Sequence, residues 1–256
     1  MVDGEAYSAG HLEVKVPSNR YLVEDSSMAE ARIGGVAISN GYFGGLSSER
    51  LSRRGWSMST YQVEFPASLT SYSGLQEKYH YDQAEILGRL SSVEDGGIYR
   101  VDSLTINGPA DLPNASDNKS VVIFVDQGLT INGDFIVPPL LANDSDLGTI
   151  SGFRQRFDPS LLFIVQGDVH INPAVEVVYG VYLVNGEIYT GNSDNRLYLF
   201  GALVSLSDKE IHFQRDLGRD NDALPGETVV SMPKYYFTLG EVIGDVSTTW
   251  REVVAD

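Results

Sequence analysis

The sequence contains no cysteine, so it can form neither a disulfide framework nor a thiolate metal site. It also lacks an apolar run near the ~18 residues that a membrane-spanning helix needs. Basic residues are few: 18 Lys and Arg stand against 35 Asp and Glu, for a formal net charge of -17. We therefore expect no nucleic-acid binding, no membrane insertion and no attraction to anionic membrane surfaces.

Residues that favour turns and strands are abundant. The chain has 26 Gly, 14 Tyr and 10 Phe, and many Ser, Asn and Asp residues separate its apolar runs. Its 256 residues suit one all-β domain, because such domains often run to ~200 to 250 residues. This composition predicts a β-rich globular chain in a single domain.

One sequence pattern recurs along the chain. The segment "VVIFVDQGLTING" (121–133) is repeated as "LLFIVQGDVHINP" (161–173), which aligns Ile131 with Ile171 at an offset of 40 residues. A similar segment lies upstream, where Ile106 aligns with Ile131 at an offset of 25, and two more lie downstream, where Gly180 aligns with Gly201 at an offset of 21. Five copies are recognisable, and a period near 20 residues is typical of a parallel β-solenoid.

Each coil of this solenoid is expected to contain three short strands. The first is apolar throughout, as in "VVIFV" and "LLFIV", which is typical of strands buried on both faces. The second alternates, so one of its faces should be in water. The third is represented by 175–178 and 196–200. We predict a mainly all-β chain: a right-handed parallel β-solenoid of about five coils.

The remaining segments are assigned around the solenoid at 97–213. A helix at 73–91, with Ser73 as N-cap, is expected to cover the first strands through Leu75, Tyr79, Ile86 and Leu90. Residues 1–72 are predicted to be a β-rich decoration, and 133–160 a long excursion from one coil. The non-repetitive segment 214–256 should cap the open end, through Tyr235, Tyr236, Phe237 and Trp250.

The outward position of the second strand is expected to form a ladder of Thr105, Thr130, His170, Tyr189 and His212. Because stacked strands lie ~4.8 Å apart, the two histidines should be ~9.6 Å apart and cannot share a metal ion. No Asp or Arg recurs at one position of successive coils. We therefore predict no catalytic residues, no enzymatic activity and no cofactor.

Two acidic turns offer weak candidates for calcium binding. "ANDSDLG" and "GRDNDALPGE" each place several oxygen donors within a few residues, as hard cations prefer. The candidate ligands are Asp144, Asp146, Asp220, Asp222 and Glu227. Neither turn fits an EF-hand loop, so ordinary Asp and Asn turns are the competing interpretation.

Several segments together carry a resemblance to a known family. They are "GEAYSAGHLEVKVP", the turn at Gly34 and Gly35, Trp56 with Tyr61, the two rungs quoted above, and the ending "QRDLGRDNDALPGE" with "WREV". In these the chain resembles the C-terminal β-solenoid domain of large uncharacterised surface proteins of candidate-phyla bacteria, related to pilus-assembly-like surface domains. Gly226, where the family more often has Ala, and Glu5-Ala6, in place of Asp-Val, depart from the pattern.

The resemblance implies an extracellular part of a longer, envelope-anchored protein, and the start "MVDGEAYSAG", which lacks a signal peptide, fits such an excised piece. The expected function is a non-enzymatic structural or adhesive module, with surface glycans or other envelope proteins as partners. A carbohydrate-binding or carbohydrate-active β-helix protein is the alternative, with its site near 133–160.

Overall fold

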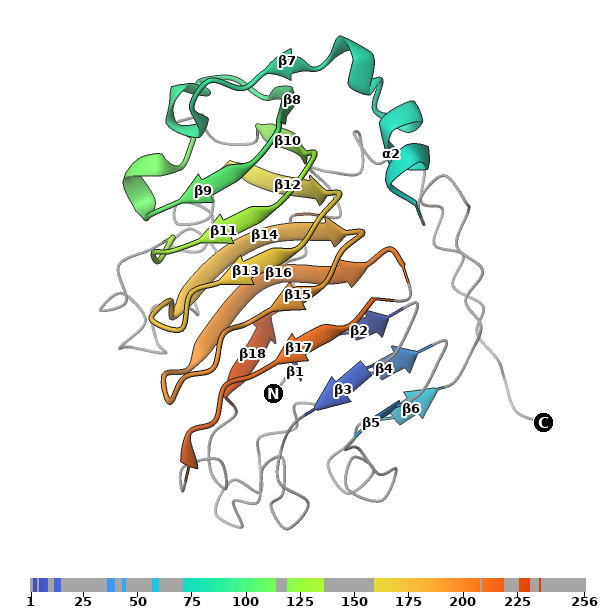
Figure 1. The fold of residues 1–256 in the computed structure, drawn as a ribbon, viewed down its shortest axis with the longest axis vertical. Helices are drawn as coiled ribbons and strands as arrows, with labels where there is room; N and C mark the ends of the chain where they lie inside the picture. Colours follow the sequence, from blue (N-terminus) through green and yellow to red (C-terminus); the bar gives the residue numbers. More distant parts are fainter. Residues whose placement is uncertain are drawn as a thin grey trace, which may run out of the picture.

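The chain forms two all-parallel β-sheets, and successive strands alternate between them (Figure 1). The computed structural model describes residues 71–113, 119–135, 159–207, 209–218, 226–230 and 235, with the backbone of six short strands between residues 2 and 59. The two parallel sheets, with strands alternating between them, confirm the predicted mainly-β, parallel solenoid architecture.

The larger sheet runs the length of the molecule. In spatial order it contains β6 (Ser57–Ser59), β4 (Val36–Ser39), β2 (Glu5–Ser8), β16 (Leu197–Ser205), β14 (Val177–Val184), β12 (Ser160–Val165), β10 (Ser120–Val125), β8 (Gly97–Val101) and β7 (Glu85–Ile86). At one end of β16 the strand β18 (Glu227–Val230) also pairs, and β1 (Val2–Asp3) pairs with β18.

The smaller sheet supplies the second strand of each coil. Its spatial order is β5 (Phe43–Gly44), β3 (Leu12–Val14), β17 (Ile211–Phe213), β15 (Ile188–Tyr189), β13 (Val169–Ile171), β11 (Leu129–Ile131) and β9 (Leu104–Ile106). In both sheets, neighbours in space are parallel, as a chain that winds repeatedly in one direction requires.

The register of the coils matches the sequence repeat residue by residue. Ile106 pairs with Ile131, Ile131 pairs with Ile171, and Gly180 pairs with Gly201. The predicted offsets are thus confirmed by the backbone pairing. The repeated asparagine has a role at the turn, because Asn132 Nδ2 donates to Asn107 Oδ1 of the preceding coil at 3.2 Å.

Burial follows the predicted difference between the two kinds of strand. In β9, Leu104 and Ile106 are buried while Thr105 is exposed, which is the period-2 pattern of a strand with one wet face. Every residue of β12 is buried, so its two faces are both covered. Inside the solenoid, Phe163 and Tyr182 stack with ring centroids 5.0 Å apart.

The predicted third strand is continuous with the first strand of the following coil. β14 and β16 each run through both segments, with bends at Gly180 and Gly201, whose φ angles are 128° and 146°. Only glycine adopts such angles readily, and the ideal Cβ of an alanine at 201 would lie 1.9 Å from the Gly180 carbonyl oxygen. Glycine therefore makes the corner of these coils.

The helix is shorter than predicted. It covers Tyr72–Lys78 (α2) rather than 73–91, and Ser71, not the predicted Ser73, is the N-cap; its Oγ accepts from the Gly74 N–H at 3.1 Å. The helix ends because His80 adopts a left-handed φ of 50°. Three short elements follow, η2 (Tyr81–Gln83), β7 and η3 (Leu90–Ser92), and η4 (Pro109–Asp111) lies after β9.

The segment from α2 to η2 covers part of the larger sheet. Tyr72, Tyr79 and Tyr81 all meet Phe124 of β10 edge-on, with ring centroids 5.1 to 6.3 Å apart. These contacts explain why the helix stops, because Tyr81 can reach Phe124 only if the chain turns back. Ile86, which the helical pattern placed on the covered face, is 79% exposed.

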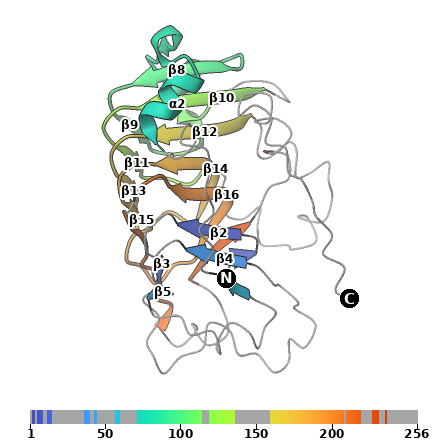
Figure 2. The same ribbon diagram turned by 90° about the vertical axis from the view of Figure 1, so that its right-hand side faces the viewer.

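The N-terminal strands stack on the end of the last coil. β2 pairs with β16 and β3 pairs with β17, both parallel (Figures 1 and 2). The sequence predicts the tail 214–256 at this edge. Of the four aromatic residues proposed there, Tyr235 is buried in the main core, and Tyr236, Phe237 and Trp250 lie outside the described residues.

The predicted excursion at 133–160 begins with ordered contacts. The Asp134 carboxylate accepts from the Glu176 and Val177 N–H groups at 2.6 and 2.8 Å, and Phe135 meets Tyr179 edge-on. The chain re-enters the sheet at Ser160, the first residue of β12. Residues 136–158 lie outside the described part. No helix within the described residues is long and apolar enough to cross a membrane.

Candidate functional site

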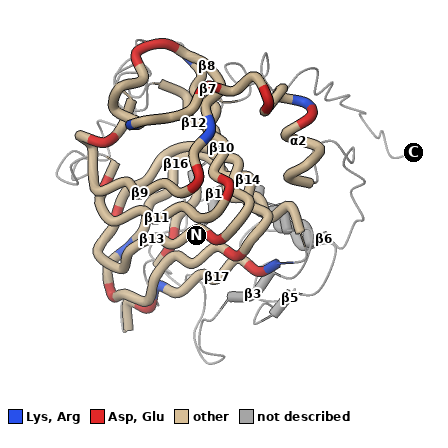
Figure 3. Tube along the Cα trace, turned by 45° about the horizontal axis from the view of Figure 1, so that its top comes forward, with Lys and Arg blue, Asp and Glu red and all other residues tan. Residues whose placement is uncertain are grey.

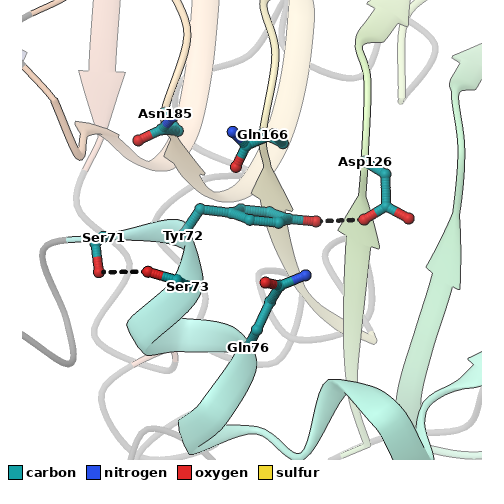
Figure 4. A pocket seen from close by; sticks show the side chains of 7 residues that line it. All are labelled: Ser71, Tyr72, Ser73, Gln76, Asp126, Gln166 and Asn185. Atoms are coloured by element: carbon teal, nitrogen blue, oxygen red, sulfur yellow. Dashed lines mark hydrogen bonds between the residues drawn. The ribbon is translucent and has the colours of Figure 1, made fainter.

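A polar pocket of about 440 Å³ lies between the start of α2 and one corner of the solenoid (Figure 4). Its lining consists of Ser71, Tyr72, Ser73, Gln76, Asp126, Gln166 and Asn185. The helix contributes one wall and three successive coils contribute the other. The pocket is therefore a product of long-range packing rather than of a local motif.

The coil wall of the pocket is a column of equivalent residues. Asp126, Gln166 and Asn185 each follow the first strand of their coil, directly after β10, β12 and β14. Their backbones continue the ladder, since the Gln166 N–H donates to Val125 O and the Asn185 N–H to Val165 O. Polar side chains are thus presented at the spacing of stacked parallel strands, ~4.8 Å.

Asp126 is held in place by two phenols. The hydroxyls of Tyr72 and Tyr81 donate to its two carboxylate oxygens at 2.6 and 2.5 Å. Burial, followed by the hydrogen bond to Asp126, raises the pKa of Tyr72 well above its ordinary value. Both tyrosines therefore stay protonated donors, and Asp126 keeps lone pairs for one further donor from the pocket.

The amide side chains in the pocket have unused hydrogen-bonding capacity. Within the described part of the chain, those of Gln76, Gln166 and Asn185 have no hydrogen-bond partner. Each can donate and accept, and no Lys or Arg is among the described residues that line the pocket. Such a lining suits a neutral ligand with several hydroxyl groups better than an anion.

A second feature is the ring ladder on the outer face of the smaller sheet. The rings of His170 and Tyr189 stack with centroids 4.8 Å apart, and those of Tyr189 and His212 are 4.6 Å apart. The predicted ladder is confirmed along its whole length, because Thr105 pairs with Thr130 and Thr130 with His170 in the same register. Because the ring faces contact one another, the ladder offers ring edges rather than an open face on which a sugar could stack.

Carboxylates flank the lower end of this ladder. Glu187 accepts from the Tyr189 hydroxyl and lies 3.4 Å from His212 Nε2, while Glu210 lies 3.8 Å from His212 Nδ1. The Tyr189 hydrogen bond lowers the pKa of Glu187 and raises that of Tyr189 to about 12. This arrangement stabilises an anionic Glu187 next to the imidazole.

The calcium candidates are not brought together by the described residues. The Glu227 carboxylate takes part in hydrogen bonds within the protein: its Oε1 accepts from Thr190 Oγ1 at 2.7 Å and from the Arg215 N–H at 2.8 Å. Asp144, Asp146, Asp220 and Asp222 lie outside the described residues. Among the residues that are described, no group of three or more His, Asp or Glu is placed to hold a metal ion.

Sequence reasoning missed the role of Arg215, although the residue begins the family-like ending. Its buried guanidinium donates to four backbone carbonyl oxygens, those of Thr190, Pro173, Asn172 and Asn195, at 2.9, 2.6, 3.2 and 3.5 Å. The residue ties together turns of two coils. The Arg-x-Leu spacing before the Pro-x-Glu of the tail was the available signal.

Comparison of the chain with family models, with curated proteins and with solved structures finds no match. The functional interpretation therefore rests on the geometry above and on the resemblance described from the sequence.

Proposed function

We propose that this chain is a non-enzymatic structural or adhesive module of the cell surface, within a larger envelope protein. The observation that carries the proposal is the in-register stacking of parallel strands from β8 to β16, with an interior filled by buried apolar side chains. Each coil contacts only its neighbours, so the fold extends along one axis and presents its turns at a regular spacing. The family-like ending supports the same interpretation.

Surface location is tested with antibodies raised against the purified chain. Labelling of intact cells of the source organism, and digestion of the epitope by protease added to intact cells, would support the proposal. Labelling that requires permeabilised cells would contradict it. A cytoplasmic marker protein, which must stay unlabelled and undigested in the same preparation, controls for broken cells.

The polar pocket favours a second candidate function, the binding of a neutral carbohydrate. Its amides, hydroxyls and Asp126 provide both donors and acceptors, as the hydroxyl groups of a sugar require. This site differs from the expected one near 133–160, because it is formed by α2 and the corner column. The pocket is open, which is suited to the weak, repeated contacts of an adhesive surface.

A glycan array followed by calorimetry tests this candidate. Binding of a neutral glycan that is lost in both Gln166→Ala and Asn185→Ala, and kept in Gln83→Ala, would place the ligand in the pocket. Gln83 is the control because it is exposed and lies outside the lining. Binding equally reduced by all three changes, or absent from the array, would reject the candidate. Release of reducing sugar would instead indicate an enzyme.

A further inference from the structure

We propose that Asn185 and Gly186 form a modification site, at which the side chain of Asn185 loses its amide in the folded protein and becomes a carboxylate. Asparagine is a thermolabile residue, and a following glycine favours the reaction because it has no Cβ to hinder attack on the side chain. Asn185 belongs to the lining of the polar pocket. This inference does not depend on the function proposed above.

Three Asn-Gly pairs lie in the described part of the chain, and each comes directly after a strand. Asn107 follows β9, Asn132 follows β11 and Asn185 follows β14. The first two belong to the repeated turn after the smaller sheet, whereas the third belongs to the corner column after the larger sheet. The three pairs therefore present the same dipeptide in different surroundings within one molecule.

The side chain of Asn185 is free to rotate. Neither its amide nitrogen nor its amide oxygen has a hydrogen-bond partner among the described residues, and Figure 4 shows it at one end of the column. In contrast, Asn132 Nδ2 donates to Asn107 Oδ1 at 3.2 Å, and Asn107 Nδ2 donates to Asp111 Oδ2 at 3.1 Å. Attack requires the side chain to turn toward the next backbone nitrogen, so these hydrogen bonds must first break.

The attacking nitrogen, that of Gly186, is available as well. Its N–H donates no hydrogen bond to any residue that the structure describes. The carbonyl oxygen of the same peptide group, Asn185 O, accepts from Ser207 Oγ at 2.7 Å. A donor on this oxygen stabilises the negative charge that the peptide group carries once its nitrogen has lost a proton. The hydrogen bond from Ser207 therefore favours the attacking form of the nitrogen.

Stacking of the coils keeps glycine at position 186. The ideal Cβ of an alanine there would lie 2.4 Å from the Gly167 carbonyl oxygen of the preceding coil and 2.5 Å from Asp168 Oδ1. A larger residue, which would shield the nitrogen, does not fit unless these neighbours move. The reactive pair is thus a consequence of the close approach between two coils.

The reaction needs only water. The Gly186 nitrogen loses its proton and bonds to Cγ of Asn185; the Cγ–Nδ2 bond breaks, and the amide nitrogen takes up a proton and leaves as ammonia. Water then opens the cyclic imide at one of its carbonyl carbons. One opening gives aspartate at position 185, and the other gives isoaspartate, in which the backbone runs through the side chain. No oxidant or reductant takes part.

The product changes the charge of the pocket. Asp126 is the one carboxylate among the described residues that line it, and a second would appear two strand steps away, at ~9.6 Å. Position 185 would also lose its N–H donors, since an ionised carboxylate only accepts. A lining that suits a neutral polyol would thereby become one that suits a cationic group.

Ageing of the whole folded chain in mildly alkaline buffer tests the proposal. The protein is then digested at acidic pH, where the reaction is slow, and peptide mass spectrometry measures the mass gain and isoaspartate at each pair. Given the hydrogen bonds to be broken, we expect conversion at Asn185 to be at least about threefold faster than at Asn132 and about tenfold faster than at Asn107. Asn107 and Asn132 are exposed and Asn185 is half-buried, so exposure alone would give the opposite order.

The same measurement in urea is the control, because unfolding removes all of these hydrogen bonds. The three rates should then become similar, since only the flanking residues still differ. Rates in the folded chain that are equal, or that follow exposure, would overturn the proposal. So would an excess at Asn185 that persists unchanged in urea, because the flanking residues rather than the fold would then select the site.

A substitution tests the role of side-chain freedom at another pair. Asp111→Ala removes the acceptor that holds both the side chain and the backbone N–H of Asn107, at 3.1 and 2.7 Å. Conversion at Asn107 should then accelerate at least about threefold. Asp102→Ala is the matched control at an exposed position, and it should leave the rate unchanged. No acceleration by Asp111→Ala, or equal acceleration by both changes, would overturn the proposal.

Discussion

At the scale of single residues, Arg215 is a buried group that binds the backbone of two coils. Its guanidinium satisfies carbonyl oxygens of Asn172, Pro173 and Thr190, and its backbone N–H binds Glu227. A buried carbonyl that loses its donor keeps the cost of having left water. The carboxyl group of Glu227 is also withdrawn from water, and this burial raises its pKa.

We predict that Arg215→Ala lowers the free energy of unfolding by about 3 kcal/mol, because several buried carbonyls lose their donor while water fills part of the space. Urea unfolding followed by circular dichroism measures the change. Arg89→Ala serves as the control, because Arg89 is exposed, and a change within about 0.5 kcal/mol is expected there. Equal effects of the two substitutions would contradict the structural role of Arg215.

The ring ladder predicts a pH dependence. The pKa of Glu187 is lowered from its ordinary value of 4.5, first by the hydrogen bond from Tyr189, so the folded state favours the ionised carboxylate. Its stabilising contribution is present above pH 4.5 and is lost as the pH falls through the lowered folded-state value.

We therefore expect Glu187→Gln to lower Tm at about pH 7 and to have a progressively smaller effect as the pH falls below 4.5 and the natural carboxylate becomes protonated. Thermal melts of both proteins across this pH range give the comparison. Glu94→Gln, at an exposed position, should leave the melting curve unchanged throughout. A Tm difference that is the same at neutral and acidic pH would show that ionisation of Glu187 is not involved.

At the scale of elements, the bends within β14 and β16 depend on glycine, at Gly180 and Gly201. Gly201→Ala should destabilise the protein by at least about 3 kcal/mol, because its φ of 146° is strained for alanine and the new Cβ meets the Gly180 carbonyl. Gly88→Ala is the matched substitution, since nothing lies within 4 Å of its Cβ.

Denaturant unfolding of the two glycine variants, compared with the unchanged chain, measures this difference. A change within about 0.5 kcal/mol is expected for the Gly88 variant, as for other exposed positions. An equally small change for Gly201→Ala would contradict the bend described at this position, because an alanine would then fit where the structure has a φ of 146° and a close Gly180 carbonyl.

The strand register was largely predictable from the sequence, whereas the helix was not. Equivalent residues of successive coils stack directly, so a side-chain column appears as a repeat, and Ile106, Ile131 and Ile171 align by inspection. The end of α2 depends instead on contacts from Tyr81 to Phe124 and Asp126, which lie more than forty residues away in the chain. Helical spacing carries no information on such contacts.

At the scale of the whole molecule, charge is unevenly balanced. Acidic residues gather mostly at turns and coil corners of the described part, and fewer basic residues lie among them (Figure 3). With a formal net charge of -17, the folded chain repels itself at low ionic strength. The ion pair between Lys119 and Asp95, at 3.5 Å, is exposed and adds little to offset this.

We predict that raising NaCl from about 10 to about 150 mM increases Tm, because the Debye length falls from ~30 to ~8 Å and repulsion among carboxylates is screened. Thermal melts at constant pH measure the shift, and sucrose of equal osmolality is the control for nonspecific solute effects. A Tm that falls with salt would mean that attractive pairs dominate, contrary to the charge balance.

The sequence by itself determined the parallel coils, their register and the alternation of buried and exposed residues, because stacking turns each structural column into a local repeat. It did not determine that the N-terminal strands follow the last coil, nor that α2 and three coil corners line a pocket. Every solenoid edge offers the same backbone groups, so the edge on which a coil stacks depends on long-range packing and on the reach of the chain. Only the tertiary structure decides that choice.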